Sequence, residues 1–189
     1  MQGNADWAAG TQTHPGEDAE RRSCLADNLQ TPFASILSCS DSRVPPELLF
    51  DQGLGDLFVA RVAGNTASGR LIDSLLYGTD VLDTKLLFVL GHSACGAVAA
   101  AVSYYPKPHP TLPFVSLIYP AVKQAKTIIR RNGGDPKDPA QVIPVATNQN
   151  VVLTRRQLKK YYNLTDDQIV GGVYDLSTQM VTMAVDMFP

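Results

Sequence analysis

The sequence has few cysteines, no long apolar run and almost no net charge. Its three cysteines cannot all pair with one another, so structural disulfides are not expected and a reducing compartment is. No apolar run approaches the roughly 20 residues that a membrane-spanning helix needs. With a formal net charge of −2, nothing in the composition suggests nucleic acid or an acidic membrane surface as a partner.

A secretory signal and internal repeats are also missing. Residues 1–6 contain neither a basic region nor an apolar region, so the sequence predicts a cytoplasmic protein. A length of 189 residues fits one domain, since domains typically run to about 100–200 residues. We therefore expect a single domain over residues 1–189, in which residues 1–31 form an N-terminal helical arm.

Short apolar runs alternate with helical patterns along the chain, which predicts an α/β fold with a central, mainly parallel β-sheet flanked by helices. The predicted strands are 33–37, 57–62, 86–90 and 168–176, the last of the chain. The predicted helices are two pieces within 1–31, one opening at 45–46, and 68–82, 96–104, 117–131 and 151–162. Glycine, proline and polar residues make 133–148 a predicted loop.

Two of the predicted strands open into turns that carry reactive side chains. Ser38–Arg43 follows the first strand, and Gly91–Gly96 follows the strand 86–90. In an open parallel sheet, ligands bind where neighbouring strands end. The side chains of these two turns can therefore meet at one edge of the sheet, although the turns lie far apart in the sequence.

Cys39, His92 and Cys95 are the candidate metal ligands in these turns. Two thiolates and one imidazole, with a fourth position left open, form a known catalytic zinc set, and soft sulfur ligands favour zinc over magnesium or calcium. The alternative is that all three residues are simply buried, which for a lone histidine is the more common case. Asp41 and Arg43 count against that alternative, because a strand end needs a reason to gather so much charge.

Three blocks of the sequence resemble the signature motifs of the β-class carbonic anhydrases. They are Cys39–Glu47, Asp56–Asn65 and Gly91–Val98, and the similarity runs from roughly His14 to Val181. The resemblance implies a zinc-dependent lyase in which zinc-bound hydroxide attacks carbon dioxide to give bicarbonate and a proton. It also implies homodimers or dimer-based oligomers, with the catalytic cleft at the subunit boundary.

The resemblance assigns a role to each candidate residue. Cys39, His92 and Cys95 would hold Zn²⁺. Asp41 would orient the hydroxide, and Arg43 would hold the Asp41 carboxylate with its fork of donors and keep it off the metal. A plain surface salt bridge between these two residues is the alternative, and such bridges contribute little.

Substrate binding is implied for four further residues, Gln30, Phe58, Tyr77 and Gly96. Gln30 matches a glutamine that reaches a neighbouring subunit's cleft, Phe58 and Tyr77 match an apolar wall for carbon dioxide, and the Gly96 amide would face the substrate. From the residues alone, Gln30 is a polar residue at a helix end, and the aromatic residues are more often core.

The resemblance favours the open-site type, in which the fourth zinc position is free for water, hydroxide or a small anion. Relatives of the closed type build a bicarbonate pocket partly from a tryptophan three residues before the first zinc cysteine. Ile36 stands at that position, although Arg61 resembles another member of the pocket. Gln30 matches the open-site relatives.

Other functions remain open or fail on particular residues. A relative could use the same site to hydrolyse carbon disulfide or carbonyl sulfide, and a non-catalytic zinc-stabilised binding protein would need a fourth ligand to close the site. A Cys-x5-Arg phosphatase loop would need arginine where Pro45 stands, and Cys95 breaks the Gly-x-Ser-x-Gly elbow of serine hydrolases. Cys24, the spare thiol, is predicted to be buried or half-buried on a one-faced helix over Glu17–Leu29.

Overall fold

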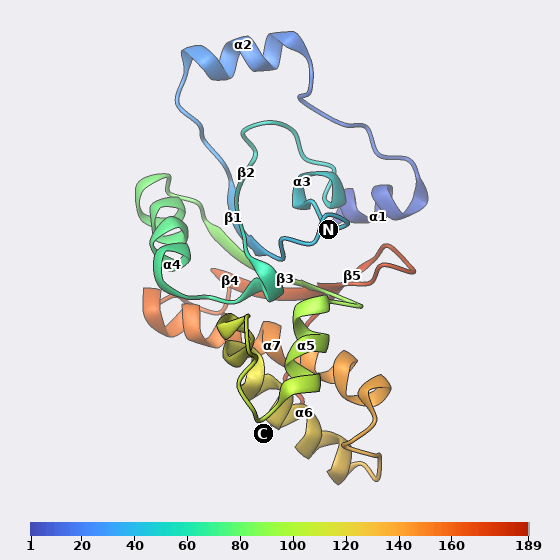
Figure 1. The fold of residues 1–189 in the computed structure, drawn as a ribbon. Coiled ribbons are helices and arrows are strands. Elements are labelled where there is room, and N and C mark those ends of the chain that lie inside the picture. Colours follow the sequence, from blue (N-terminus) through green and yellow to red (C-terminus); the bar gives the residue numbers. More distant parts are fainter. Residues whose placement is uncertain (189) are drawn as a thin grey trace.

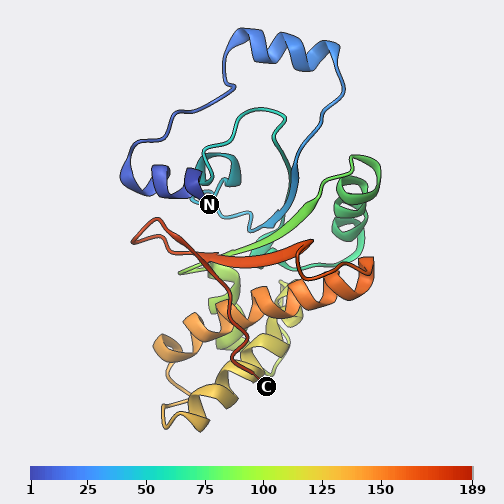
Figure 2. The ribbon, with the colours of Figure 1, turned by 180° about the vertical axis from the view of Figure 1, so that it is seen from behind.

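A computed structural model describes residues 1–188, which fold around one five-stranded sheet (Figures 1 and 2). The spatial order of the strands is β2-β1-β3-β4-β5, and the four neighbours from β2 to β4 run parallel. The strands are β1 (Ala34–Ser38), β2 (Leu57–Arg61), β3 (Leu86–His92), β4 (Ile169–Tyr174) and β5 (Val181–Met183). The predicted α/β class with a mainly parallel sheet is confirmed.

Burial on both faces explains why β1 and β3 are continuous apolar runs. All five residues of β1 are buried, as are six of the seven in β3. Because side chains alternate between faces, Leu37 and Val89 pack with the helices α4 (Gly69–Leu76) and α7 (Pro139–Tyr162) on one side of the sheet. Ile36 and Phe88 point to the opposite face, toward the short helix α3 (Pro46–Leu49).

Three helices gather on one side of the sheet in both views (Figures 1 and 2). They are α5 (Gly96–Tyr104), α6 (Tyr119–Arg131) and α7 (Pro139–Tyr162). The helix α4 (Gly69–Leu76) continues into a wider π-helical turn over Tyr77–Val81, so the predicted helix 68–82 is present with a change of pitch near its end. No helix within residues 1–188 is long and apolar enough to cross a membrane.

The prediction of a loop over residues 133–148 is wrong in its second half. The connection between α6 and α7 ends at Asp138, whose carboxylate accepts a hydrogen bond from the Ala140 amide at 2.9 Å. Pro139 occupies the first helical position, where a missing N–H costs nothing because that group has no intrahelical partner. An Asp-Pro start signal was therefore present, and α7 runs unbroken through Pro144 for 24 residues.

The predicted strand over 168–176 is present as β4, but it is not the last one. The chain turns after Tyr174 and returns as β5, antiparallel to β4. Asn4, in the helix α1 (Gln2–Ala9), supports this return because its buried side chain accepts from the Val181 amide at 2.7 Å and donates to the carbonyls of Leu49 and Gln179. One buried asparagine thus joins the N-terminus, α3 (Pro46–Leu49) and the edge of the sheet.

The helix α2 (Ala19–Asp27) lies at one end of the molecule in both views and contacts the segment before β2, where the Arg21 guanidinium donates to the Leu54 carbonyl oxygen at 2.9 Å and to Asp56 at 3.1 Å. The break between two helical pieces of the arm is confirmed, but α2 has no buried residue. The expectation of a buried or half-buried Cys24 is wrong, since this residue is exposed and its thiol is free. A helix with no fully buried residue leaves much of its surface available to a partner.

Candidate metal centre

The ends of β1 and β3 bring Cys39, His92 and Cys95 together. The sulfur of each cysteine and a ring nitrogen of His92 lie within 4.8 Å of one another, and all three residues are buried. Cys39 follows β1 directly, His92 is the last residue of β3, and Cys95 precedes α5. Since β1 and β3 are parallel neighbours, these positions lie at one edge of the sheet, as the sequence predicted.

The hydrogen bonds of His92 leave one ring nitrogen free for a metal. Its Nδ1 lies 2.9 Å from the Ser93 carbonyl oxygen, which only accepts, so Nδ1 carries the proton. Its Nε2 is fully buried and has no partner among the described residues. A buried nitrogen lone pair beside two sulfurs fits a zinc ion, and a metal-bound histidine is usually oriented through its other nitrogen in this way.

The two thiols share one proton. A hydrogen bond from Cys95, together with the backbone amides of Asp41 and Gly64, lowers the pKa of Cys39 against the opposing effect of burial. The same sharing of one proton, together with burial, raises the pKa of Cys95. A zinc ion held by these two sulfurs would take the place of that proton, because both cysteines bind metal as thiolates.

Asp41 and Arg43 form a two-pronged ion pair beside the cluster. The Arg43 Nε and Nη2 donate to the two Asp41 carboxylate oxygens at 2.9 and 2.8 Å. This hydrogen bonding is the main reason that the pKa of Asp41 lies below its usual range. The Asp41 Oδ2 is 3.9 Å from His92 Nε2, so the paired carboxylate faces the metal position without leaving its arginine.

Arg61, at the end of β2, holds the backbone of the loop that carries these residues. Its guanidinium donates to the carbonyl oxygens of Cys39 at 2.9 Å and Asp41 at 2.5 Å. Two carbonyls of one loop, two residues apart, are therefore fixed by a single planar donor group. The resemblance placed Arg61 at a bicarbonate pocket. Its hold on the metal loop is visible only in the folded chain.

This geometry agrees with the comparisons with known proteins. The sequence model of the family described as "Carbonic anhydrase" matches residues 34–181. That range contains the four parallel strands and all three metal-binding residues. The chain belongs to the β-class carbonic anhydrase family. The Cys2His cluster is the zinc-type metal site of this family.

The family members similar to this chain include a bacterial protein and two proteins of solved structure. A carbonic anhydrase of Mycolicibacterium smegmatis is 48% identical over 101 residues, which is 53% of this chain and 48% of that protein. The β-carbonic anhydrase CcaA superposes with a TM-score of 0.70 at 25% identity, over 87% of this chain and 78% of that one. A Coccomyxa β-carbonic anhydrase in complex with acetazolamide gives 0.74 at 24% identity, over 98% and 84%. The matches span about half the length of the curated relatives.

The four predicted substrate residues are not all brought to the cluster. Gly96 opens α5 directly after Cys95, and a Cβ added there would meet no atom within 4 Å, so open space adjoins this turn. Phe58 lies beside Tyr77, with 6.0 Å between ring centroids, and pairs in register with Ser35. Ser35 precedes Cys39 by four residues, or about 13 Å of strand. Gln30 is exposed on the connection between α2 and β1.

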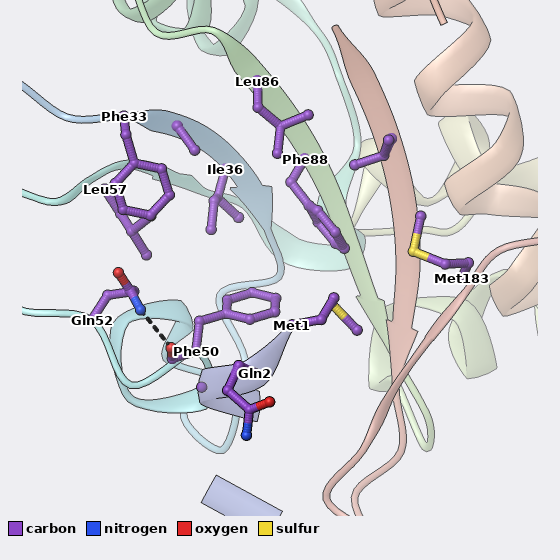
Figure 3. Close-up of a pocket in the computed structure, with 13 residues that line it drawn as sticks. Met1, Gln2, Phe33, Ile36, Phe50, Gln52, Leu57, Leu86, Phe88 and Met183 are labelled. Atoms are coloured by element: carbon purple, nitrogen blue, oxygen red, sulfur yellow. Dashed lines mark hydrogen bonds between the residues drawn. The ribbon is translucent and has the colours of Figure 1, made fainter. Parts of the chain in front are cut away.

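An apolar cavity lies apart from the metal cluster. It has a volume of about 370 Å³ and lies on the sheet face that carries Ile36 and Phe88 (Figure 3). We call it the groove, and its lining includes Phe33, Ile36, Phe50, Leu57, Phe88 and Met183. None of the metal-binding residues lines it. The groove is therefore an uncovered part of the sheet rather than the reaction site.

Proposed function

We propose that this chain is a zinc-dependent carbonic anhydrase that interconverts carbon dioxide and bicarbonate. The observation that carries the proposal is the arrangement of Cys39, His92 and Cys95 around one point, with the Asp41–Arg43 pair facing it. A purely structural zinc site would be closed by a fourth cysteine or histidine, and the cluster holds none among the described residues. The family to which the chain belongs supports the same activity.

Zinc, when bound, supplies the Lewis acidity that makes a water molecule acidic near neutral pH. Asp41 accepts a hydrogen bond from the attacking water and points its lone pair at the carbon of carbon dioxide. Because its pKa lies below the usual range, Asp41 stays ionised and acts as an acceptor rather than as a store for the released proton. Arg43 fixes the carboxylate through two hydrogen bonds, so little free energy is needed to orient Asp41 during the reaction.

The same pair supports an open site. The Arg43 fork engages both oxygens of Asp41, and the Arg43 backbone amide adds a third bond at 3.0 Å. To become a metal ligand, the carboxylate would have to give up charge-assisted hydrogen bonds, which are the strong ones. We therefore assign the fourth metal position at neutral pH to water, hydroxide or a small anion.

The substrate side of the site is proposed to be completed by a second copy of the chain. Gln30, Phe58 and Tyr77 lie away from the metal cluster of their own chain, and Tyr77 is 47% exposed. Leu29, next to Gln30, is 89% exposed, and α2 has no fully buried residue. A homodimer that covers the groove and the N-terminal arm would remove this apolar surface from water and bring these residues to a neighbouring cleft.

Metal content and stopped-flow hydration of carbon dioxide, measured on the same preparation, test the function. We expect one zinc per chain and a rate far above that of the buffer. Bound zinc with no hydration would contradict the proposal. Turnover of carbon disulfide or carbonyl sulfide in that case would identify the alternative hydrolase, and the absence of all three activities would indicate a zinc-stabilised binding protein.

Mixed dimers test the shared cleft. A dimer of one Gln30→Ala chain and one Cys95→Ser chain contains an intact site only if Gln30 acts across the interface, because the metal-binding chain then receives Gln30 from its partner. We expect such dimers to recover close to half the wild-type activity. Activity no higher than that of the Gln30→Ala homodimer would contradict an exchanged glutamine.

A further inference from the structure

A hydrogen-bonded path connects α7 to the metal ligand Cys39. The side-chain amide of Asn150 donates to the Gly64 carbonyl oxygen at 2.9 Å, although 86 positions separate the two residues. The Gly64 backbone amide donates in turn to the Cys39 sulfur at 3.3 Å. Both bonds are buried, and Asn150 is 3% exposed. The path therefore runs through the interior, where a hydrogen bond is stronger than at the surface.

The turn at the middle of this path has an unusual backbone. Gly64 has a φ of 67° and Asn65 a φ of 44°, so two successive residues lie in the left-handed region. A side chain at position 64 would meet the Ile118 side chain at 2.8 Å and Ala97 at 3.0 Å. Glycine adopts the left-handed region at no steric cost, so the turn favours glycine at position 64 both for its backbone conformation and for space. Asn150 fixes this turn, because its side-chain amide donates to the Gly64 carbonyl oxygen.

We propose that Asn150 is a positioning residue for the metal centre, which keeps the Gly64 amide directed at the Cys39 sulfur. The amide and the carbonyl of Gly64 flank one α-carbon, so a fixed carbonyl limits the rotation that would turn the N–H away. The inference rests on the metal centre of the proposed function but not on its reaction. Asn150 touches neither the substrate nor the metal position, and acts only through Gly64.

A thiolate that accepts an N–H bond is a weaker electron donor to its metal than one that does not. Loss of the Gly64 bond leaves the Cys39 sulfur more electron-rich and less well oriented. Changes to such outer partners of metal ligands typically reduce metal affinity or activity by about 10- to 100-fold. Asn150→Leu, similar in size but without a donor, is the variant that removes the path.

Gln149 provides a matched control on the same helix. It is fully buried, and neither polar atom of its side chain has a partner among the described residues. Gln149→Met therefore removes a buried amide one position away without touching Gly64. Both variants are loaded with Co²⁺, and zinc affinity is measured by competition with a chelator. Neither readout requires turnover.

We expect Asn150→Leu to shift the sulfur-to-cobalt charge-transfer band to longer wavelength and to weaken zinc binding about tenfold or more. Gln149→Met should keep the wild-type band and affinity. A wild-type band and affinity in a folded Asn150→Leu protein would overturn the inference, whether or not the wild type hydrates carbon dioxide. Should Asn150→Leu not fold, NMR of the ¹¹³Cd-loaded wild type decides, because the inference requires cadmium coupling to the Gly64 amide proton and slow exchange of the Asn150 side-chain amide. Absence of both would overturn it.

Discussion

The surroundings of the two ends of β1 differ sharply. A single chain buries and hydrogen-bonds the residues at one end but leaves apolar residues exposed at the other. At its carboxyl end, the metal ligands are buried, and the loop that bears Cys39 is held by Arg61, by Gly64 and by the Asp41–Arg43 pair. At its amino end, Phe33 is 55% exposed, the groove is open and the arm carries a helix with no fully buried residue. One end of the strand thus carries a metal site that a single chain forms, and the other end carries apolar surface that the chain leaves exposed.

The difference reflects what each kind of chemistry requires. A metal centre needs its donor atoms placed to within a few tenths of an ångström, and strands and buried hydrogen bonds of one chain provide that. Apolar surface needs only to be covered, and a second copy can do this with its N-terminal arm. Changes at the carboxyl end should therefore abolish chemistry within one chain, whereas changes at the amino end should act through assembly.

The largest expected effect is the loss of a metal ligand. Cys95→Ser, Cys39→Ser and His92→Ala should each lose stoichiometric zinc and with it essentially all activity, because a set of three donors tolerates no substitution. Since thiolate and neutral imidazole are the binding forms, zinc retention in the wild type should weaken as the pH falls. Metal analysis after gel filtration measures both effects.

Cys24→Ser is the control, since this exposed thiol lies on α2. It should keep one zinc per chain and full activity. Stoichiometric zinc in Cys95→Ser would show that the cluster is not the metal site.

The next effect is loss of the ion pair beside the metal. Asp41→Ala should reduce kcat/KM by about 100-fold or more, the range for a positioned acid-base group, while the zinc stays bound. Arg43→Ala should lose most activity for another reason, because the freed Asp41 becomes the fourth zinc ligand. X-ray absorption of the two variants separates the causes, with an added oxygen ligand at roughly 2.0–2.2 Å replacing water only in Arg43→Ala. Equal activity in Asp41→Ala and the wild type would remove Asp41 from the reaction.

A smaller effect is expected where the amino end of β1 meets a second copy. Phe33→Glu places a charge in the apolar groove, and loss of a buried aromatic anchor at an interface costs about 2 kcal/mol or more, equivalent to a roughly 30-fold weaker dimer. Analytical ultracentrifugation over a concentration series measures the shift, and zinc content should not change.

Tyr161→Glu is the matched control for this substitution, because Tyr161 is a comparably exposed aromatic residue at the end of α7. It should leave the association unaltered. If Phe33→Glu and Tyr161→Glu associate equally well, the groove is not covered by a second copy.

The smallest effect concerns how the arm is tied to the body. The Asp51 carboxylate accepts from the Thr13 and His14 amides, each at 2.8 Å, and from the Thr13 hydroxyl at 3.1 Å. The Thr13 amide is the largest cause of a lowered pKa for Asp51. Because the folded pKa is below the unfolded one, the stabilisation is present above about pH 4 and is lost as the pH falls through the folded pKa.

Asp51→Asn should therefore lower the melting temperature of the metal-free protein at pH 7, and this deficit should shrink below about pH 4. Asp27→Asn, at the exposed end of α2, should show no deficit at either pH. A deficit for Asp51→Asn that does not change with pH would mean that the carboxylate charge does not tie down the arm.

The sequence by itself determined the four parallel strands and the metal ligands, but not β5. Apolar runs before Cys39 and His92 were enough to predict parallel strands, and the rule that side chains meet where such strands end placed the ligands together. The α7 start was also readable from Asp138 and Pro139, but the proline-rich composition of 133–148 concealed it. These features depend on local patterns, which is why a single sequence carries them.

Only the tertiary structure decided how the site is supported. Asn4, Arg61 and Asn150 act on backbone groups of distant segments, and no spacing in the sequence marks which carbonyl or amide a buried polar side chain will reach. The exposure of Cys24 could not be predicted from the sequence for a related reason. The periodicity of α2 shows that one face is apolar, but what covers that face depends on neighbours that its own sequence does not contain.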